Sequence, residues 1–323
     1  MYGRHAVRDL QPAMDLRQIR AFLAIADTGS VTRAAELLHI VQPAVSRQLK
    51  LLEDGIGAPL FERDRRGMQL TEAGHILLER ARRALRELDA AQLEIRPVPG
   101  LIAGTANLGL LPSSCELLTA PLVGALQRQY PHIRVSLSVG YTDHLLRWLE
   151  SGEIDAALLY DPAPSPAREV VPLVEESLSL VGPAALGLSD DAPVGVAALG
   201  EAPLVLPSAP HRLRSLVEHA CAVAGVPLAI AAETNALSVQ KALVGQGYGL
   251  SVMPRVAVQG EIERGLFSAA RIDGAAFQRR IVLALPTTRR STSAVRCATA
   301  TLQACVRDIA CSGNWHGASW LGD

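Results

Sequence analysis

The sequence predicts a mixed α/β protein with a small helical domain at the N-terminus, one long helix after it, and a larger domain of strands and helices. Two observations carry this prediction. Apolar residues recur at helical spacing between residues 16 and 52, and strand-like runs alternate with helical patterns after residue 103. A chain of 323 residues is long enough for two or three domains with their own cores.

Composition and charge narrow the class of protein. Hydrophobic residues make up 49% of the chain and charged residues 20%, which is typical of a soluble globular protein. No uninterrupted apolar run is long enough to span a bilayer, and residues 1–11 show no signal-peptide pattern, so we expect a cytoplasmic protein without a membrane partner. The net charge of −1 favours no polyanionic partner, so any nucleic-acid interpretation depends on local charge placement.

The cysteines exclude two kinds of site. Their number is odd and no C-x-x-C pair occurs, which favours reduced thiols over a disulfide framework or a zinc site. We therefore predict no metal and no cofactor. The five positions are Cys115, Cys221, Cys297, Cys305 and Cys311.

Three helices follow an unpatterned extension, residues 1–13, which we predict to be disordered; Met14 is an alternative start to Met1. The first helix covers residues 16–26 and stops at a glycine, Gly29. Ser30 caps the second helix. The third begins near Gln42, with a proline in its first turn where a missing N–H costs nothing, and we expect it to end at residues 54–55.

A hairpin and a long helix come next. Residues 59–71 contain two short β-like runs around the turn of residues 64–67. A helix then runs from Thr71 to about Arg96, until the segment PVPG (97–100) breaks it. Its apolar residues are spaced four and three apart in turn, as in a coiled-coil seam, and we predict that they form a dimer interface: Leu77, Ala81, Ala84, Leu88, Ala91 and Ile95.

The second and third helices form a helix-turn-helix pattern with polar residues on its outward face. Such a third helix fits the major groove of B-DNA. There Gln42 can pair with adenine, while Arg47 can bond a guanine edge or a phosphate. The basic hairpin would contact the flanking DNA backbone as a wing. The alternative is that these residues are ordinary solvated charges. The predicted DNA-binding residues are Ser30, Thr32, Arg33, Gln42, Pro43, Ser46, Arg47, Lys50, Arg63, Arg65 and Arg66.

Residues 14–96 resemble the N-terminal part of the LysR-type transcriptional regulators. The matching pieces are DLRQIRAFLAIADTGSVTRAAELL, QPAVSRQLKLLE and PLFERDRRGMQLTEAG. A looser resemblance continues through YPHIRVSLSVG, LESGEIDAALLY, LSLVG and LVGQGYGLSVMP to about residue 310, and within the family it points to nitrogen-assimilation-control and cysteine-biosynthesis activators. One position departs from the family pattern, because Val41 stands where a capping residue is common.

The resemblance implies both architecture and function. It implies a winged helix-turn-helix over residues 14–72, a linker helix and hinge over 73–100, and a two-lobed effector domain over 101–311, like a periplasmic solute-binding protein. Lobe I would comprise residues 101–178 and 280–311, and lobe II residues 179–279. The family resemblance also implies a bacterial activator that binds promoter DNA as a homodimer or homotetramer, contacts RNA polymerase and responds to a small co-inducer.

We expect a mainly parallel sheet in this larger domain. The predicted strands are 105–111, 133–139, 154–160, 178–182, 203–207, 228–233, 248–254 and 280–286, and residues 312–323 are predicted to be a disordered tail. Ligands of open α/β sheets bind beyond the carboxyl ends of strands, at helix N-termini. Small polar residues at four such ends predict a site for an anionic co-inducer: Ser113, Ser114, Thr142, Ser208, Thr234 and Asn235.

Several alternatives stay open. Each of these hydroxyls could merely cap its helix, and His211 and Arg212 could either bind the anion or lie in solvent. Cys115 at a helix start could make the protein a thiol-based redox-sensing regulator, or it could be an inert buried thiol. A constitutive regulator without a small-molecule response is also compatible with the sequence. No G-x-S-x-G motif, P-loop or metal spacing supports an enzyme.

Overall fold

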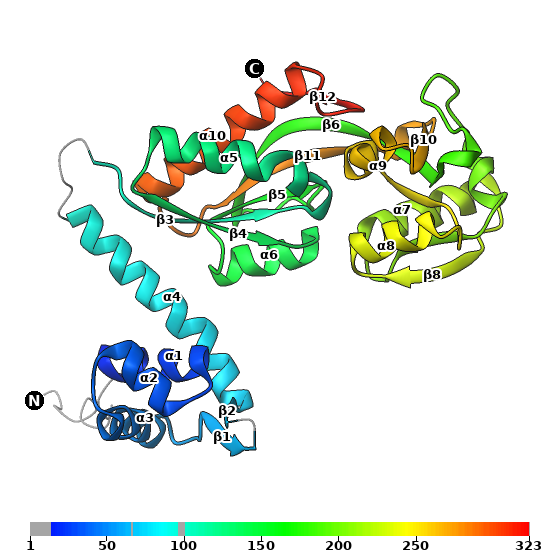
Figure 1. Cartoon of the computed structure of the whole chain (residues 1–323). Coiled ribbons are helices and arrows are strands. Elements are labelled where there is room, and N and C mark those ends of the chain that lie inside the picture. Colours follow the sequence, from blue (N-terminus) through cyan, green and yellow to red (C-terminus); the bar gives the residue numbers. More distant parts are fainter. Residues whose placement is uncertain (1–13, 66, 96–100, 323) are drawn as a thin grey trace, which may run out of the picture. The chain divides into compact units, whose positions relative to one another are not determined.

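The computed structural model describes residues 14–65, 67–95 and 101–322, and the chain divides into two compact units, residues 1–95 and 96–323 (Figure 1). The predicted extension (1–13), Arg66 and the PVPG segment lie outside the described residues. Within those residues, no helix is both long enough and apolar enough to cross a bilayer.

The first unit begins with three helices, α1 (Leu16–Thr28), α2 (Val31–Leu38) and α3 (Gln42–Ile56). Asp15 begins α1 by accepting a hydrogen bond from the Arg17 N–H. Ser30 accepts one from the Arg33 N–H at the start of α2, as predicted. The helices pack through fully buried apolar side chains, among them Phe22, Ile25, Ala34, Val45 and Leu52.

The end of α3 differs from the prediction. The helix continues past Gly55 to Ile56, and the left-handed residue that ends it is Gly57, with φ of 79°. Gly57 donates its N–H to the Glu53 carbonyl, and the backbone conformation there is one that glycine adopts without strain. Glycine in a helix interior costs only about 1 kcal/mol, so Gly55 does not stop the helix.

The hairpin is formed by β1 (Phe61–Asp64) and β2 (Gly67–Leu70), which pair antiparallel. It is anchored to the helices because Met68 donates its N–H to the Gly29 carbonyl across 3.0 Å. A Cβ at Gly67, where φ is 114°, would lie 2.6 Å from that carbonyl oxygen. Glycine at position 67 therefore permits the close approach that fixes the hairpin against α1.

The long helix α4 (Glu72–Ile95) begins as predicted, with Thr71 Oγ1 accepting a hydrogen bond from the Gly74 N–H. Its first turns pack onto the core of the first unit: Ala81 is buried there and Leu77 is half-buried. The remaining residues of the predicted seam are exposed, namely Ala84, Leu88, Ala91 and Ile95. The surface open to a second chain is therefore shorter than the predicted seam.

The second unit contains a mixed sheet, not the mainly parallel sheet that we predicted. Strands β3 (Gly104–Leu110), β4 (Ile133–Val139) and β5 (Ala156–Tyr160) are parallel, but β11 (Gln278–Pro286) pairs antiparallel with both β5 and β6 (Arg168–Pro183). The antiparallel pairing of β11 with its neighbours β5 and β6 makes the sheet mixed. Helices α5 (Cys115–Gln129) and α10 (Ser293–Cys311) cover one face of the sheet, and α6 (Thr142–Ser151) lies on the other (Figure 1).

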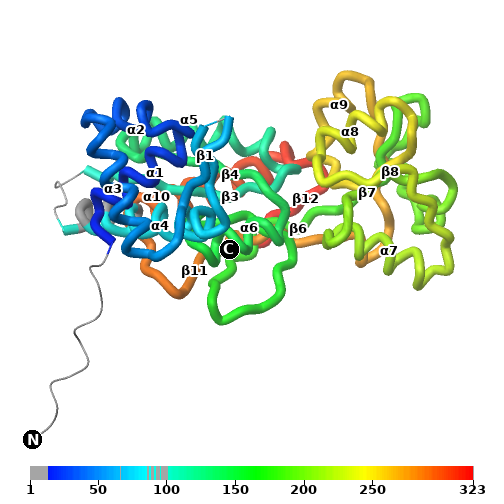
Figure 2. Tube along the Cα trace, turned by 90° about the horizontal axis from the view of Figure 1, so that it is seen from below, coloured from blue at the N-terminus to red at the C-terminus, as the bar shows by residue number. Residues whose placement is uncertain are grey.

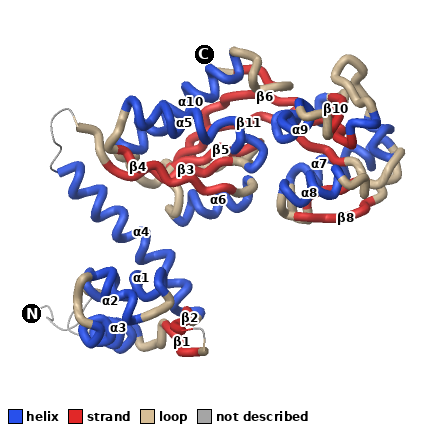
Figure 3. The backbone as a smooth tube through the Cα atoms, viewed as in Figure 1, coloured by secondary structure: helices blue, strands red, loops and turns tan. Residues whose placement is uncertain are grey.

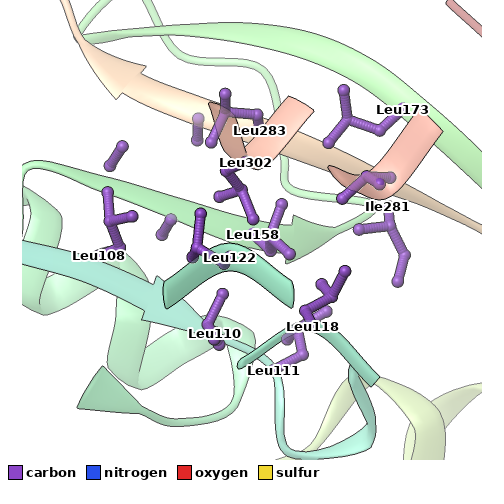
Figure 4. Close-up of a cluster of buried hydrophobic side chains, with 14 of the residues drawn as sticks. Leu108, Leu110, Leu111, Leu118, Leu122, Leu158, Leu173, Ile281, Leu283 and Leu302 are labelled. Carbon is purple, nitrogen blue, oxygen red and sulfur yellow. The ribbon is translucent and has the colours of Figure 1, made fainter. Parts of the chain in front are cut away.

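The second unit has two lobes with separate cores. The core of lobe I includes Leu108, Leu122 and Leu283 (Figure 4). The cores of lobe II lie among α7 (Arg212–Ala224), α8 (Leu237–Gly245), α9 (Gln259–Glu263) and the strands β7 (Leu204–Pro207), β8 (Ile230–Thr234), β9 (Ser251–Pro254) and β10 (Phe267–Arg271) (Figure 2). Strand β6 runs from lobe I into lobe II, where it pairs with β10, and β11 begins at the junction and pairs with the lobe I part of β6 (Figure 3). Along the chain, the buried residues change cores between positions 174 and 178 and between 277 and 281.

The tail is ordered, which corrects the prediction for residues 312–322. Trp315 is 1% exposed in the core of lobe I, and β12 (Ala318–Trp320) pairs antiparallel with β6. The glycines and serines of the tail suggested disorder, but the large apolar side chain of Trp315 and the strand pairing outweigh that local tendency. The prediction also missed β10 and most of the length of β6.

Candidate functional site

The outward face of α3 carries the polar residues that the sequence singled out. Gln42, Pro43, Arg47 and Lys50 are exposed, and Ser46 is half-buried. The Gln42 amide donates to Ser46 Oγ across 3.1 Å, which joins the two side chains across the first and second turns of the helix. As expected, Val41 at the N-cap makes no side-chain hydrogen bond, so this helix presents uncapped backbone N–H groups together with an amide, a hydroxyl and two cations. Such an arrangement can bond base edges and phosphate oxygens.

The remaining predicted DNA contacts flank α3 in sequence. Thr32 and Arg33 are exposed on α2, whereas the Ser30 hydroxyl caps that helix. Arg63 and Arg65 are exposed on the hairpin, and Arg66 lies outside the described residues. Exposed cations attract phosphate oxygens, so this hairpin has the charge that a wing contacting the DNA backbone requires.

The second unit contains an outer cavity of about 550 Å³ between its lobes. Three helix starts line it: Pro112, where the 3-10 turn η1 (Pro112–Ser114) leads directly into α5, the N-cap Tyr141 of α6, and the N-cap Ala236 of α8. None of these three starts has a side-chain cap. Backbone N–H groups without side-chain caps and the positive ends of three helix dipoles therefore meet at one cavity, which favours a bound anion.

Apolar side chains form much of the rest of this cavity, including Val139, Trp148 and Leu237. Lys241 also lines it, but its ammonium is paired with Glu261 across 2.7 Å and lies 3.6 Å from Glu116. Since carboxylates already offset that ammonium, the attraction for an anion comes mainly from the helix ends.

Two of the six predicted effector residues line this region. Asn235 lines the outer cavity, and Ser113 lines a smaller inner chamber that shares Pro112, Tyr141 and Leu237 with it. The other four make structural contacts. Ser114 is fully buried and donates to the Leu111 carbonyl, and Thr142 Oγ1 accepts from the Tyr160 N–H.

On the lobe II side, Thr234 Oγ1 accepts from the Ala236 N–H, and the Ser208 N–H donates to the Thr234 carbonyl. Neither residue is among those lining the two cavities. For Ser114, Thr142 and Thr234, the interpretation of the hydroxyls as local hydrogen-bonding groups therefore describes the structure better than ligand binding does.

The inner chamber contains chemistry that the sequence did not reveal. Arg279, on β11, is 6% exposed, and its guanidinium lies 4.7 Å above the ring of Tyr160. Arg279 also donates to Ser113 Oγ across 3.1 Å. His211, left open between anion ligand and solvent, is 8% exposed and caps α7 by accepting from the Leu213 N–H. Burial, followed by the nearby charge of Arg279, lowers the pKa of His211 to about 4.

Behind Arg279 lies a buried carboxylate, Glu176, which accepts from Arg279 Nε across 2.5 Å. Its second oxygen accepts from the indole N–H of Trp315, in the segment predicted to be disordered. These partners lie 103 and 139 residues from Glu176 in sequence. The only sequence signal was a charged pair of residues, Glu175 and Glu176, inside an otherwise strand-like segment.

The thiol predicted to be a possible redox sensor has an unfavourable environment. Cys115 is half-buried and donates to the Leu111 carbonyl. Burial, with a smaller effect from Glu116, raises the pKa of Cys115 to about 11. A thiol protonated at neutral pH is a weak nucleophile, so burial of Cys115 disfavours the thiolate on which peroxide sensing depends.

Comparison with known proteins agrees with this architecture. Residues 16–75 match the family described as "Bacterial regulatory helix-turn-helix protein, lysR family", and residues 99–306 match the "LysR substrate binding domain". The nitrogen assimilation regulatory protein nac of Klebsiella aerogenes is 34% identical over 250 residues, covering 76% of this chain and 80% of that protein. A probable hydrogen peroxide-inducible genes activator of Streptomyces viridosporus is 32% identical, covering 94% and 97%.

Solved structures show the same fold. Full-length CbnR in complex with its target DNA has a TM-score of 0.69 at 24% identity, covering 90% of this chain and all of that one. A full-length OxyR variant of Pseudomonas aeruginosa has a TM-score of 0.68 at 24% identity, covering 92% and 96%. Because both domains match in order over most of the sequence, the chain belongs to the LysR family of transcriptional regulators, with a DNA-binding helix-turn-helix domain and an effector-binding domain.

Proposed function

We propose that this regulator binds promoter DNA as a homo-oligomer, reads the sequence with α3, and responds to a small anionic co-inducer in the outer cavity of its effector domain. The observation that carries the ligand proposal is the meeting of three uncapped helix N-termini at one cavity of about 550 Å³. Helix N-termini bind anions through free N–H groups and the helix dipole. The apolar walls favour a co-inducer with an aliphatic or aromatic body.

The DNA proposal assigns roles along α3. Gln42 and Arg47 read base edges, Ser46 permits close approach, and Lys50 contacts phosphate, all from the exposed or half-buried face of the helix. The proteins with similar folds include CbnR, which was solved with its target DNA. Arg63 and Arg65 contact the backbone as a wing.

The oligomer proposal depends on α4. Its second half presents the exposed apolar residues Ala84, Leu88, Ala91 and Ile95, of which Leu88 and Ile95 are 45% and 76% exposed. A second copy of the helix would bury them and would place two copies of α3 on successive half-sites. We propose a dimer as the minimal DNA-binding unit, assembled into a homotetramer that contacts RNA polymerase as an activator.

One experiment tests the central claim. Selection of bound duplexes from a random library should enrich an inverted repeat, and binding to that repeat should weaken steeply as salt rises. Adding carboxylate probes with aliphatic or aromatic bodies should raise the melting temperature of the protein and alter its affinity for the selected duplex. Enrichment of no sequence would overturn the DNA proposal. Sequence-specific binding that no anion affects would instead favour a constitutive regulator.

A further inference from the structure

His211 has a fixed orientation at the wall of the inner chamber. The Leu213 N–H is shared between Tyr160 Oη at 2.9 Å and His211 Nδ1 at 3.1 Å. Tyr160 Oη lies 3.5 Å from Nδ1 and, since it accepts from Leu213, can direct its own proton toward that nitrogen. Both neighbours suit an unprotonated Nδ1, and this is the tautomer that we assign. The neutral ring therefore carries its proton on Nε2, on the opposite side of the imidazole. Because burial lowers the pKa of His211 to about 4, the ring is an uncharged donor at neutral pH.

That donor is unpaired. Nε2 of His211 is buried, and none of the described residues accepts a hydrogen bond from it. The ring itself lines the inner chamber and is 8% exposed. A buried N–H group without a partner is unfavourable. Nε2 has almost no accessible surface in this structure, so an oxygen acceptor that entered the chamber and displaced its wall enough to reach Nε2 would relieve that cost.

The charge of the chamber is already balanced. Arg279 is the one charged side chain among the described residues that line it, and the buried carboxylate of Glu176 lies 2.5 Å from its guanidinium. Trp315 holds that carboxylate through its indole N–H, across 2.9 Å. A second anionic group entering the chamber would lose its hydration without meeting an uncompensated cation, whereas an uncharged oxygen would lose much less.

We infer that the inner chamber is a specificity subsite for an uncharged hydrogen-bond acceptor of the co-inducer, a carbonyl or hydroxyl oxygen that accepts from His211 Nε2. The chamber volume of about 40 Å³ suits such a small group. It shares Pro112, Tyr141 and Leu237 with the outer cavity, so the two spaces are adjacent, and the co-inducer would extend from one into the other. This inference rests on the proposed function, since the anionic end of the same molecule occupies the outer cavity.

Three probes of similar shape separate the possibilities: 4-ethylbenzoate, 4-acetylbenzoate and terephthalate. Each has one carboxylate on a benzene ring, and the opposite substituent offers no acceptor, an uncharged carbonyl, or a second carboxylate. We expect 4-acetylbenzoate to bind the full-length protein about tenfold more tightly than either of the others in calorimetric titration. His211→Phe should equalise 4-acetylbenzoate and 4-ethylbenzoate.

Two further variants keep the test independent of folding defects. His211→Asn can still cap α7 but is too short to donate into the chamber, so it should also lose the preference. His219→Phe, an exposed position on the same helix, should retain it. Glu176→Gln should leave Arg279 uncompensated and shift the preference about tenfold toward terephthalate.

The outcomes distinguish this inference from the proposed function. Equal binding of all three probes by the native protein, or a carbonyl preference that survives both His211 substitutions, would overturn the subsite while leaving the anion site intact. Failure of every carboxylate to bind would overturn the anionic co-inducer and the subsite together.

Discussion

Trp315 donates its indole N–H to Glu176 across 2.9 Å, and both side chains are 1% exposed. The contact ties the C-terminal segment to β6 where that strand passes from lobe I toward lobe II. The same carboxylate accepts a hydrogen bond from Arg279, which lines the inner chamber. A residue at the end of the chain thus helps to position the cleft.

Trp315→Phe should destabilise the second unit by about 2 kcal/mol, because it removes a hydrogen bond to a buried carboxylate while keeping an aromatic ring in the core. The melting temperature of that unit should fall by roughly 4–8 °C. Trp320→Phe, at a half-buried position on β12, serves as the matched control and should cost less than about 1 kcal/mol. Equal effects in thermal and urea unfolding would show that the indole bond contributes no special stability.

Arg47→Ala should weaken binding to the selected duplex by about 1–3 kcal/mol, because an exposed guanidinium on α3 is lost without disturbing the core. Mobility-shift titrations measure the affinity, and circular dichroism checks the fold. Arg307→Ala, on the exposed face of α10 in the other unit, should bind DNA normally. Unchanged affinity in the Arg47 variant would remove this residue from the interface.

Leu88→Glu should dissociate the oligomer, because it places a charge in the exposed apolar part of α4 that we assign to the second chain. Sedimentation should show a smaller mass, and DNA affinity should fall with it. Glu87→Gln changes a neighbouring exposed residue outside the seam and should leave the mass unchanged. A Leu88→Glu protein that keeps its native mass would place the oligomer interface elsewhere.

The lowered pKa of His211 predicts a loss of stability in acid. The unfolded chain protonates this imidazole near its ordinary pKa of 6.5, whereas the folded protein resists protonation until about pH 4. The unfolded state therefore binds more protons in this window, and stability should decrease as pH falls from 6.5 to 4, by at most about 1.4 kcal/mol per pH unit.

Denaturant unfolding between about pH 4 and the neutral range measures this slope. His211→Asn, which can cap α7 but does not titrate, should lack the His211 component and show a shallower dependence. Parallel curves for the two proteins would mean that other groups produce the acid sensitivity.

The raised pKa of Cys115 predicts an unreactive thiol. At neutral pH this residue should alkylate with iodoacetamide far more slowly than the exposed thiol of Cys311, because burial keeps it protonated. Mass spectrometry of modified peptides gives the rates. Treatment with hydrogen peroxide should leave DNA affinity unchanged. A peroxide response that disappears in Cys115→Ser would restore the redox-sensing alternative.

The sequence by itself determined the local features of this protein. Ser30 as a cap, Pro43 in the first turn of α3 and the uncapped Val41 were all predictable, because each depends on hydrogen bonds within a few residues. Strand β4 also has its predicted bounds, since alternating apolar and polar residues mark it directly. The family resemblance extended these local features to the domain architecture.

Only the tertiary structure decided which polar groups meet in the cleft. Ser113 faces the inner chamber and Ser114 faces the core, although nothing in two adjacent serines distinguishes them. Arg279, Glu176 and Trp315 come together from strands and a tail far apart in the chain, and the direction in which β6 and β11 pair brings them there. Local sequence patterns report short-range hydrogen bonding and burial, whereas a buried ion pair depends on packing between distant segments.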